Sequence, residues 1–229
     1  MLFLLAKVLI CLVRCGHDPA TPEKVTVRTL LAGAEFVWRN KAMLGAVSPD
    51  LFAVLLGGAT ALLPMFAKDI LHVGPWGLGL LRSAPALGAV MMAVVLTRWP
   101  LTRRVCHTML AAVALYGVCM LVFGMSTDFA LSLAALVVSG GADMVSVVVR
   151  QTLVQLETPN EMRGRVSAIN SVFIGASNQL GEFESGATAA LMGPVGSVVA
   201  GGVGTLLVAA LWFKWFPSLS QRDQMVENA

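Results

Sequence analysis

Five charged side chains lie inside apolar stretches of this sequence, and their chemistry needs an explanation first. They are Arg82, Asp143, Arg150, Glu182 and Glu184. In the hydrocarbon core of a bilayer, a charged side chain is costly unless it faces a partner or a water-filled cavity. The chemistry that these residues indicate is therefore binding and proton exchange along a path for an ion or a polar solute.

A stripe of polar side chains accompanies Glu182 along one apolar stretch. Residues three and four apart share a helix face, so one face carries Asn170, Ser171, Asn178, Glu182 and Ser185. A carboxylate in a membrane cavity has its charged form disfavoured, which lets it exchange protons during transport. We predict that Glu182 faces a cavity and, helped by Asn178, carries any proton or cation coupling.

Glu184 follows Glu182 by two residues, about 200° around a helix, so the two carboxylates do not face the same space. For Glu184, a buried pairing with arginine, a place near the interface and a functional role all stay open. Asp143 and Arg150 are seven residues apart, too distant for contact within one straight helix. Each is expected to have a partner elsewhere.

We assign Asp143 and Arg82 to substrate or proton coupling, with a packing network as the alternative for Asp143. Arg150 is interpreted as structural, reaching toward the near end of its helix. The guanidinium groups of Arg163 and Arg165 are expected to brace neighbouring helices by hydrogen-bonding carbonyls at their C-terminal ends. A solvated loop is the alternative for this pair.

Asp50 is assigned a structural or gating role. It follows Ser48 and Pro49, a pattern typical of a helix that starts with a serine cap and a proline in its first turn. If the apolar run begins earlier, Pro49 is a kink and Asp50 lies inside the membrane.

The composition favours a membrane protein. Hydrophobic residues make up 57% of the 229 residues and charged residues 13%, with a mean hydropathy of +0.78, against about 25% charged in an average soluble domain. Because a bilayer core of about 30 Å needs roughly 20 apolar residues per helix, we predict an all-α protein with six transmembrane helices. The apolar stretches run over residues 45–67, 75–97, 105–125, 129–150, 166–191 and 195–216.

These stretches form one transmembrane domain, residues 45–216. Residues 1–13 are interpreted as the remnant of a preceding transmembrane helix, residues 14–44 as a cytoplasmic loop with an interfacial helix, and residues 217–229 as a cytoplasmic tail. Basic residues gather in alternate connections, 14–41, 98–104, 163–165 and 214–222, whereas the other connections hold Lys68 alone. Since cytoplasmic loops retain Lys and Arg, we place both termini and the loops 98–104 and 151–165 in the cytoplasm.

Glycines and tryptophans fit this arrangement. The paired glycines at 57–58, 140–141 and 201–202 predict close helix packing or local bending, and the small residues at 196, 200 and 204 share one helix face. The tryptophans at 38, 76, 99, 212 and 215 fall near the ends of predicted spans, where an aromatic belt is expected.

No enzyme motif is present. The sequence lacks GxSxG, a Walker loop and HExxH, and its cysteines and histidines lack the spacing of metal ligands. We therefore expect no catalytic residue, no cofactor and no metal site, and we interpret Cys11, Cys15, Cys106 and Cys119 as structural thiols. A net charge of +3 with dispersed Lys and Arg argues against nucleic acid as a partner.

Three segments carry a family resemblance: residues 50–89, residues 140–186 with the loop TPNEMRGR and the run GEFESG, and residues 193–212. They resemble the C-terminal half of a major facilitator superfamily transporter, in the bacterial branch of transmembrane secretion effectors related to the enterobactin exporter. The resemblance implies twelve spans in two six-helix halves, each half built from two inverted three-helix repeats, with substrate held between the halves near the midplane. This chain corresponds to spans seven to twelve, in the bacterial cytoplasmic (inner) membrane.

The resemblance implies a secondary active exporter of small organic molecules such as siderophores or drugs. One half lacks one wall of the cavity, so the expected partners are the lipid bilayer, a small-molecule substrate, and a complementary N-terminal half or a second copy. The alternative is a non-transporting remnant, or a regulatory or assembly subunit of a membrane complex. The basic loop 98–104 stands where the family has a signature with Gly and Asp, and it contains neither.

Overall fold

The computed structural model describes Ser48 and residues 59–99, 101, 105–159 and 162–215. These residues form a short 3-10 helix η1 (Ala59–Leu62), one turn of α-helix α4 (Leu63–Met65) and a π-helical turn η2 (Phe66–Ile70). Four long helices follow, α5 (Pro75–Arg98), α6 (Val105–Met125), α7 (Phe129–Glu157) and α8 (Arg163–Trp215). The described residues contain no strand, so the predicted all-α class is confirmed for this part of the chain.

Local chemistry fixes where the long helices begin. Helix α5 starts with Pro75, whose missing N–H is not needed in a first turn, directly after the extended residue Gly74. Helix α7 is capped by Asp128, whose Oδ1 accepts a hydrogen bond from the Leu131 N–H at 2.7 Å. Such a cap satisfies one of the free donors of the first turn.

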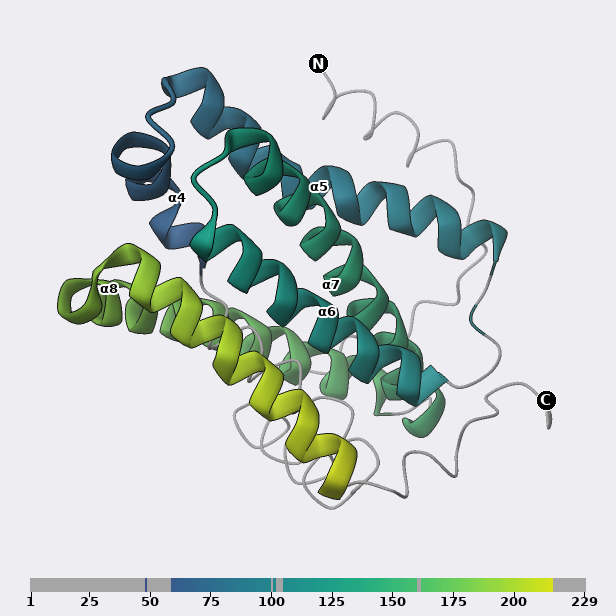
Figure 1. The fold of residues 1–229 in the computed structure, drawn as a ribbon. Helices are drawn as coiled ribbons and strands as arrows, with labels where there is room; N and C mark the ends of the chain where they lie inside the picture. Colours follow the sequence, from purple (N-terminus) through teal and green to yellow (C-terminus); the bar gives the residue numbers. More distant parts are fainter. Residues whose placement is uncertain (1–47, 49–58, 100, 102–104, 160–161, 216–229) are drawn as a thin grey trace.

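Helix α8 is two helices joined at Gly193. This glycine has φ 79° and ψ 164°, a combination that almost only glycine adopts, and Pro194 follows it. A straight helix of 53 residues would be about 80 Å long, far more than a bilayer core of about 30 Å. Instead, the arms 163–192 and 194–215 fold back on each other (Figure 1). The predicted break at residues 192–194 is confirmed.

Two serines hold this turn together. The Ser197 hydroxyl donates a hydrogen bond to the Ser185 carbonyl at 3.0 Å, and it also pairs with the Thr188 hydroxyl at 2.7 Å. The turn that the glycine permits is therefore closed by polar contacts between the two arms.

Four helices among the described residues are long and apolar enough to cross a membrane, and the fourth of them is α8 with its break. The first predicted span, 45–67, lies largely outside the described residues, as do residues 1–13, 14–44 and 217–229.

Ser48, the residue predicted as a helix cap, is described and is itself helical, whereas a capping residue has non-helical backbone angles. Its hydroxyl accepts a hydrogen bond from the Trp212 indole at 3.0 Å.

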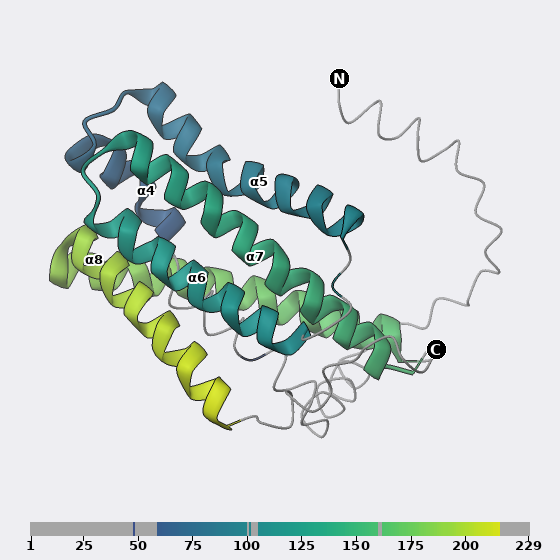
Figure 2. The same ribbon diagram turned by 45° about the vertical axis from the view of Figure 1, so that its right-hand side comes forward.

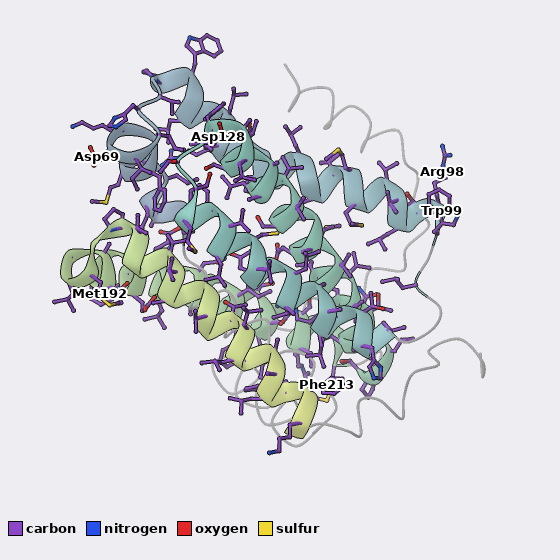
Figure 3. The ribbon with its side chains drawn as sticks, in the orientation of Figure 1. Asp69, Arg98, Trp99, Asp128, Met192 and Phe213 are labelled. Carbon is purple, nitrogen blue, oxygen red and sulfur yellow. The ribbon has the colours of Figure 1, made fainter. Side chains whose placement is uncertain are left out.

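The connections alternate between the two ends of the bundle. Figure 3 shows Asp69, Asp128 and Met192 at one end, and Arg98, Trp99 and Phe213 at the other.

The loop predicted over residues 151–165 is shorter than expected, because α7 continues to Glu157. The apolar run ends near residue 150, but the helix does not have to end with it. Residues 151–157 contain no glycine or proline that would end a helix, and the first helix breaker is Pro159.

Helix α7 lies between α5 and α6 in both views (Figures 1 and 2). At two glycines the backbones of α7 and α5 approach each other directly: a Cβ atom at Gly140 would lie 2.5 Å from the Pro85 carbonyl carbon, and one at Gly88 would lie 2.8 Å from the Val137 carbonyl carbon. Real Cβ atoms do not approach this closely, so only glycine fits. The close packing predicted at residues 140–141 is confirmed at Gly140.

Helix α6 and the second arm of α8 also approach each other closely at glycines, beside the side chains of Leu121 and Leu206. A Cβ atom at Gly202 would lie 3.1 Å from the Gly117 carbonyl oxygen, and the reverse distance is also 3.1 Å. Of the small residues predicted to share a face, Ala200 is exposed, and Gly196 and Gly204 are half-buried. The buried Gly202 contacts α6.

The largest group of buried apolar side chains joins η1, α4 and η2 to the neighbouring ends of the long helices. At its centre the rings of Phe66 and Phe123 stack, with centroids 4.6 Å apart and both side chains fully buried. This core fixes η1 and α4 against the helices and so positions one wall of the cavity described next.

Candidate functional site

A cavity of about 200 Å³ lies where η1, α4, α5, α6, α7 and α8 meet. Its lining combines polar side chains with apolar ones, and the lining residues are Ala59, Thr60, Leu63, Pro85, Tyr116, Met120, Leu136, Ser139, Gly140, Asp143, Asn178 and Glu182. Six elements separated along the chain contribute to it, so the cavity exists only because the bundle brings them together.

Three of the four residues predicted for substrate or proton coupling line this cavity. Asp143 comes from α7, and Asn178 and Glu182 come from the first arm of α8, one helical turn apart. Asp143 is half-buried, whereas Asn178 and Glu182 are exposed. The arrangement therefore places two carboxylates and one amide around one space.

The charged side chains of the lining are the carboxylates of Asp143 and Glu182. Asp143 also interacts with another group of the chain. The carboxylates can bind a proton or a cationic group, and the amide can hydrogen-bond a polar solute, while Leu63, Met120 and Leu136 offer apolar contact.

Sequence reasoning missed three polar members of the lining, Thr60, Tyr116 and Ser139. Tyr116 is the single tyrosine of the chain, and its place within an otherwise apolar stretch was a usable signal. Ser139 was harder to find, because its hydroxyl donates to the Leu136 carbonyl at 2.8 Å. Such a bond within a helix is common for serine in apolar helices.

The rest of the polar stripe on α8 has other surroundings. Ser185 is buried at the turn between the two arms, where its carbonyl accepts the hydrogen bond from Ser197. The Ser171 hydroxyl donates to the Ser167 carbonyl at 3.0 Å, and Asn170 is half-buried. Of the five residues predicted on one face, only Asn178 and Glu182 line the cavity.

The remaining charged residues of the spans lie elsewhere. Arg82, predicted for coupling, is exposed on α5 and is not part of the lining, although Pro85 one turn later is. Glu184 is half-buried and also outside the lining, in keeping with its position about 200° from Glu182. Arg150 is 2% exposed, so its side chain is buried on α7.

The residues predicted for structural or gating roles are described only in part. Arg165 is half-buried in the first turn of α8, and it interacts with another group of the chain. The side chain of Arg163 and all of Asp50 lie outside the described residues. Among the residues that the structure describes, no three His, Cys, Asp or Glu side chains gather where they could hold a metal ion, and the Cys119 thiol is buried.

Comparison with known proteins identifies a matching family and its relatives. A family model described as transmembrane secretion effector matches residues 2–228. The chain is 26% identical over 195 residues to the enterobactin exporter EntS of Escherichia coli O1:K1 / APEC, and 27% identical over 195 residues to the enterobactin exporter EntS of Citrobacter koseri. Each match covers 84% of this chain and 46% of the relative. The chain thus spans about half the length of the curated relatives that it matches.

Proposed function

Because the chain belongs to the transmembrane secretion effector family of the major facilitator superfamily, we propose that it acts as one half of a secondary active exporter. Small organic molecules, such as siderophores or drugs, are the proposed substrates. The observation that carries the proposal is the cavity that Asp143, Asn178 and Glu182 line inside an otherwise apolar helical bundle.

The proposed substrates are chosen from the cavity and from the relatives. The printed name of the relatives is enterobactin exporter, which supports a siderophore or a similar amphipathic solute here. The cavity offers both carboxylate and apolar surface, which suits a molecule that has polar groups on an apolar frame. At about 200 Å³, it is smaller than the usual 300–1,000 Å³ of a ligand pocket, so we propose that a partner half supplies the opposite wall.

The proposed mechanism is alternating access with proton exchange at Glu182. Protonation of Glu182 removes one negative charge from the cavity, and deprotonation restores that charge. A cycle that exposes these carboxylates first to one side of the membrane and then to the other would couple proton entry to export. The amide of Asn178, one turn from Glu182, hydrogen-bonds the substrate or the protonated carboxyl.

We propose that the end of the bundle that carries Arg98, Arg165 and Lys214 faces the cytoplasm of a bacterial inner membrane. The reason is the retention of basic residues on the cytoplasmic side. The opposite end, with Lys68, Asp69 and Asp128, would then face the periplasm.

Transport by a two-half assembly tests the function. The chain is expressed together with the N-terminal six-span half of the Escherichia coli enterobactin exporter, and inside-out membrane vesicles are prepared. We expect an acid-inside pH gradient to drive accumulation of enterobactin, and a protonophore to abolish it. Vesicles that contain only the N-terminal half serve as the control. If the two halves co-purify as a complex and accumulation still equals that control, the chain is a non-transporting subunit and the proposal fails.

A further inference from the structure

We propose that an apolar groove between α5, α6 and α7 binds one acyl chain of an anionic phospholipid of the bilayer, with the headgroup at Arg98. The groove has a volume of about 430 Å³ and is separate from the polar cavity. Its lining comes from all three helices: Gly88, Met91, Met92, Val95, Thr108, Ala111, Ala112, Leu115, Val137, Val138, Gly141, Ala142 and Val145.

The lining matches the chemistry of a hydrocarbon chain. Thr108 is the only residue of the lining with a polar side chain. Small residues on α6, Ala111 and Ala112, leave the space open, and Met91 and Met92 are flexible side chains that adapt to an irregular neighbour. An apolar site of this kind has nothing to orient a polar solute, but it offers dispersion contacts along its whole length to an alkyl chain.

The groove faces away from the polar cavity. On α7 the cavity is lined by Leu136 and Asp143, and the groove by Val138 and Val145, each two residues further on. Two residues correspond to about 200° of rotation, so α7 separates the two spaces. If the cavity faces the translocation path, the opposite side of α7 faces the bilayer, where phospholipid is the abundant apolar neighbour.

The α5 wall of the groove leads to a positive charge. Gly88, Met91, Val95 and Arg98 follow at intervals of three, four and three, so they lie on one helix face. Arg98 is exposed at the end of α5, beside Trp99, which is 73% exposed (Figure 3). Arginine and tryptophan at a helix end are typical of the interface where lipid headgroups lie.

The length of this wall fits one leaflet. The rise from Gly88 to Arg98 is about 15 Å, which is half of a hydrocarbon core of about 30 Å. A phosphate held by the Arg98 guanidinium therefore leaves its acyl chain running along Val95 and Met91 to Gly88, near the midplane. A positive residue at the mouth and a depth of one leaflet favour an anionic lipid over a second copy of the chain as the occupant.

The experiment measures lipid binding to the purified full chain. Phosphatidylglycerol with a photoreactive diazirine near the end of one acyl chain is added to the chain in phosphatidylcholine nanodiscs, and cross-linked peptides are identified by mass spectrometry. We expect cross-links to concentrate between residues 88–95 of α5 and 108–115 of α6. Cross-links spread evenly over all exposed apolar residues would show an unspecific lipid shell only and would overturn the proposal.

Two variants and their matched controls separate the acyl site from the headgroup site. Ala111→Phe fills the groove and should remove the concentrated cross-links, whereas Ala210→Phe, at another exposed alanine on α8, should not. Arg98→Gln should lower the preference for phosphatidylglycerol over phosphatidylcholine about five-fold, the effect of one arginine near an anionic headgroup. Lys214→Gln, exposed near the end of α8, should leave the preference unchanged.

Several outcomes count against the proposal. An unchanged preference in Arg98→Gln would show that the headgroup does not bind there. Loss of the cross-links in both phenylalanine variants would show that they do not report on the groove. Cross-links between two copies of the chain through Met91 or Ala111, with no lipid adduct, would assign the groove to a protein interface. Each variant is first compared with the wild type by circular dichroism, so that misfolding is recognised.

Discussion

Replacing Gly140 with alanine should separate α7 from α5 and destabilise the bundle. A Cβ atom at this position would lie 2.5 Å from both the carbonyl carbon and the Cα atom of Pro85, and closer still to the carbonyl oxygen. These are backbone atoms of a rigid helix, so the helices have to move apart by about 1 Å to reach ordinary contact distances. A gap of that size forfeits a quarter to a half of the dispersion energy between the facing atoms.

The adjacent glycine provides a matched control. A Cβ atom at Gly141 would lie 3.5 Å from the Gly88 carbonyl oxygen, an ordinary contact. Alanine in a helix interior gains about 1 kcal/mol over glycine, and this gain applies to both positions. We therefore expect Gly141→Ala to be neutral or stabilising. Gly140→Ala should lower the free energy of unfolding by about 2 kcal/mol, since overpacking costs about 1–3 kcal/mol or more and the propensity gain offsets part of it.

Both variants are compared in the same detergent micelles by titration with a denaturing detergent, with helix content as the signal. Gly140 and Pro85 also line the polar cavity, so separation of α5 and α7 should widen it as well. Equal stability of the two alanine variants would show that α5 and α7 do not meet through the backbone at Gly140.

Single cysteines are placed at Thr127 and at Lys214 in a chain whose native cysteines are replaced by serine. An impermeant thiol reagent added outside the cell should label the cysteine at position 127 and leave the one at position 214 unlabelled. Labelling at position 214 would overturn the proposed orientation. These positions are exposed, whereas the neighbouring Ser126 is 6% exposed. Gly193→Ala should lower the free energy of unfolding by about 1–3 kcal/mol because of the positive φ at this position. Gly186→Ala, where a Cβ atom meets nothing within 4 Å, should not lower it. An unchanged free energy of unfolding in Gly193→Ala would argue against the turn. Phe123→Ala, at a fully buried ring, should cost about 3–5 kcal/mol, and a loss below 1 kcal/mol in the same titration would place this ring outside the core.

The sequence predicted the helices best where composition and helix breakers coincide. The span expected over residues 75–97 is observed at Pro75–Arg98, because a proline begins it and charged and aromatic residues end it. The break in α8 was predictable since Gly193 and Pro194 stand together between two apolar runs. The end of α7 was not predictable from apolarity, because a helix can continue beyond the bilayer into polar sequence.

The cavity was predictable only in part. Asn178 and Glu182 share a face on a helix whose polar residues repeat at helical spacing, and this periodicity is visible in the sequence. Helix α6 shows no repeating polar face, so no periodicity showed that Tyr116 would face the cavity. Arg82 was a candidate for the same reason as Asp143, a charge in an apolar stretch, but only the arrangement of α5 and α7 decides which of the two lines the cavity.

We propose that Glu182, in the cavity, couples export to the proton gradient, and a pair of neighbouring carboxylates provides the test. The rate of enterobactin accumulation, driven by the pH gradient, is measured in inside-out vesicles that contain the two-half assembly with Glu182→Gln or with Glu184→Gln. Both substitutions remove one carboxylate two residues apart on the same helix, but only Glu182 lines the cavity. We expect Glu182→Gln to abolish accumulation at normal expression and Glu184→Gln to keep it. Wild-type accumulation in Glu182→Gln, or equal loss in both variants, would show that Glu182 is not the coupling residue.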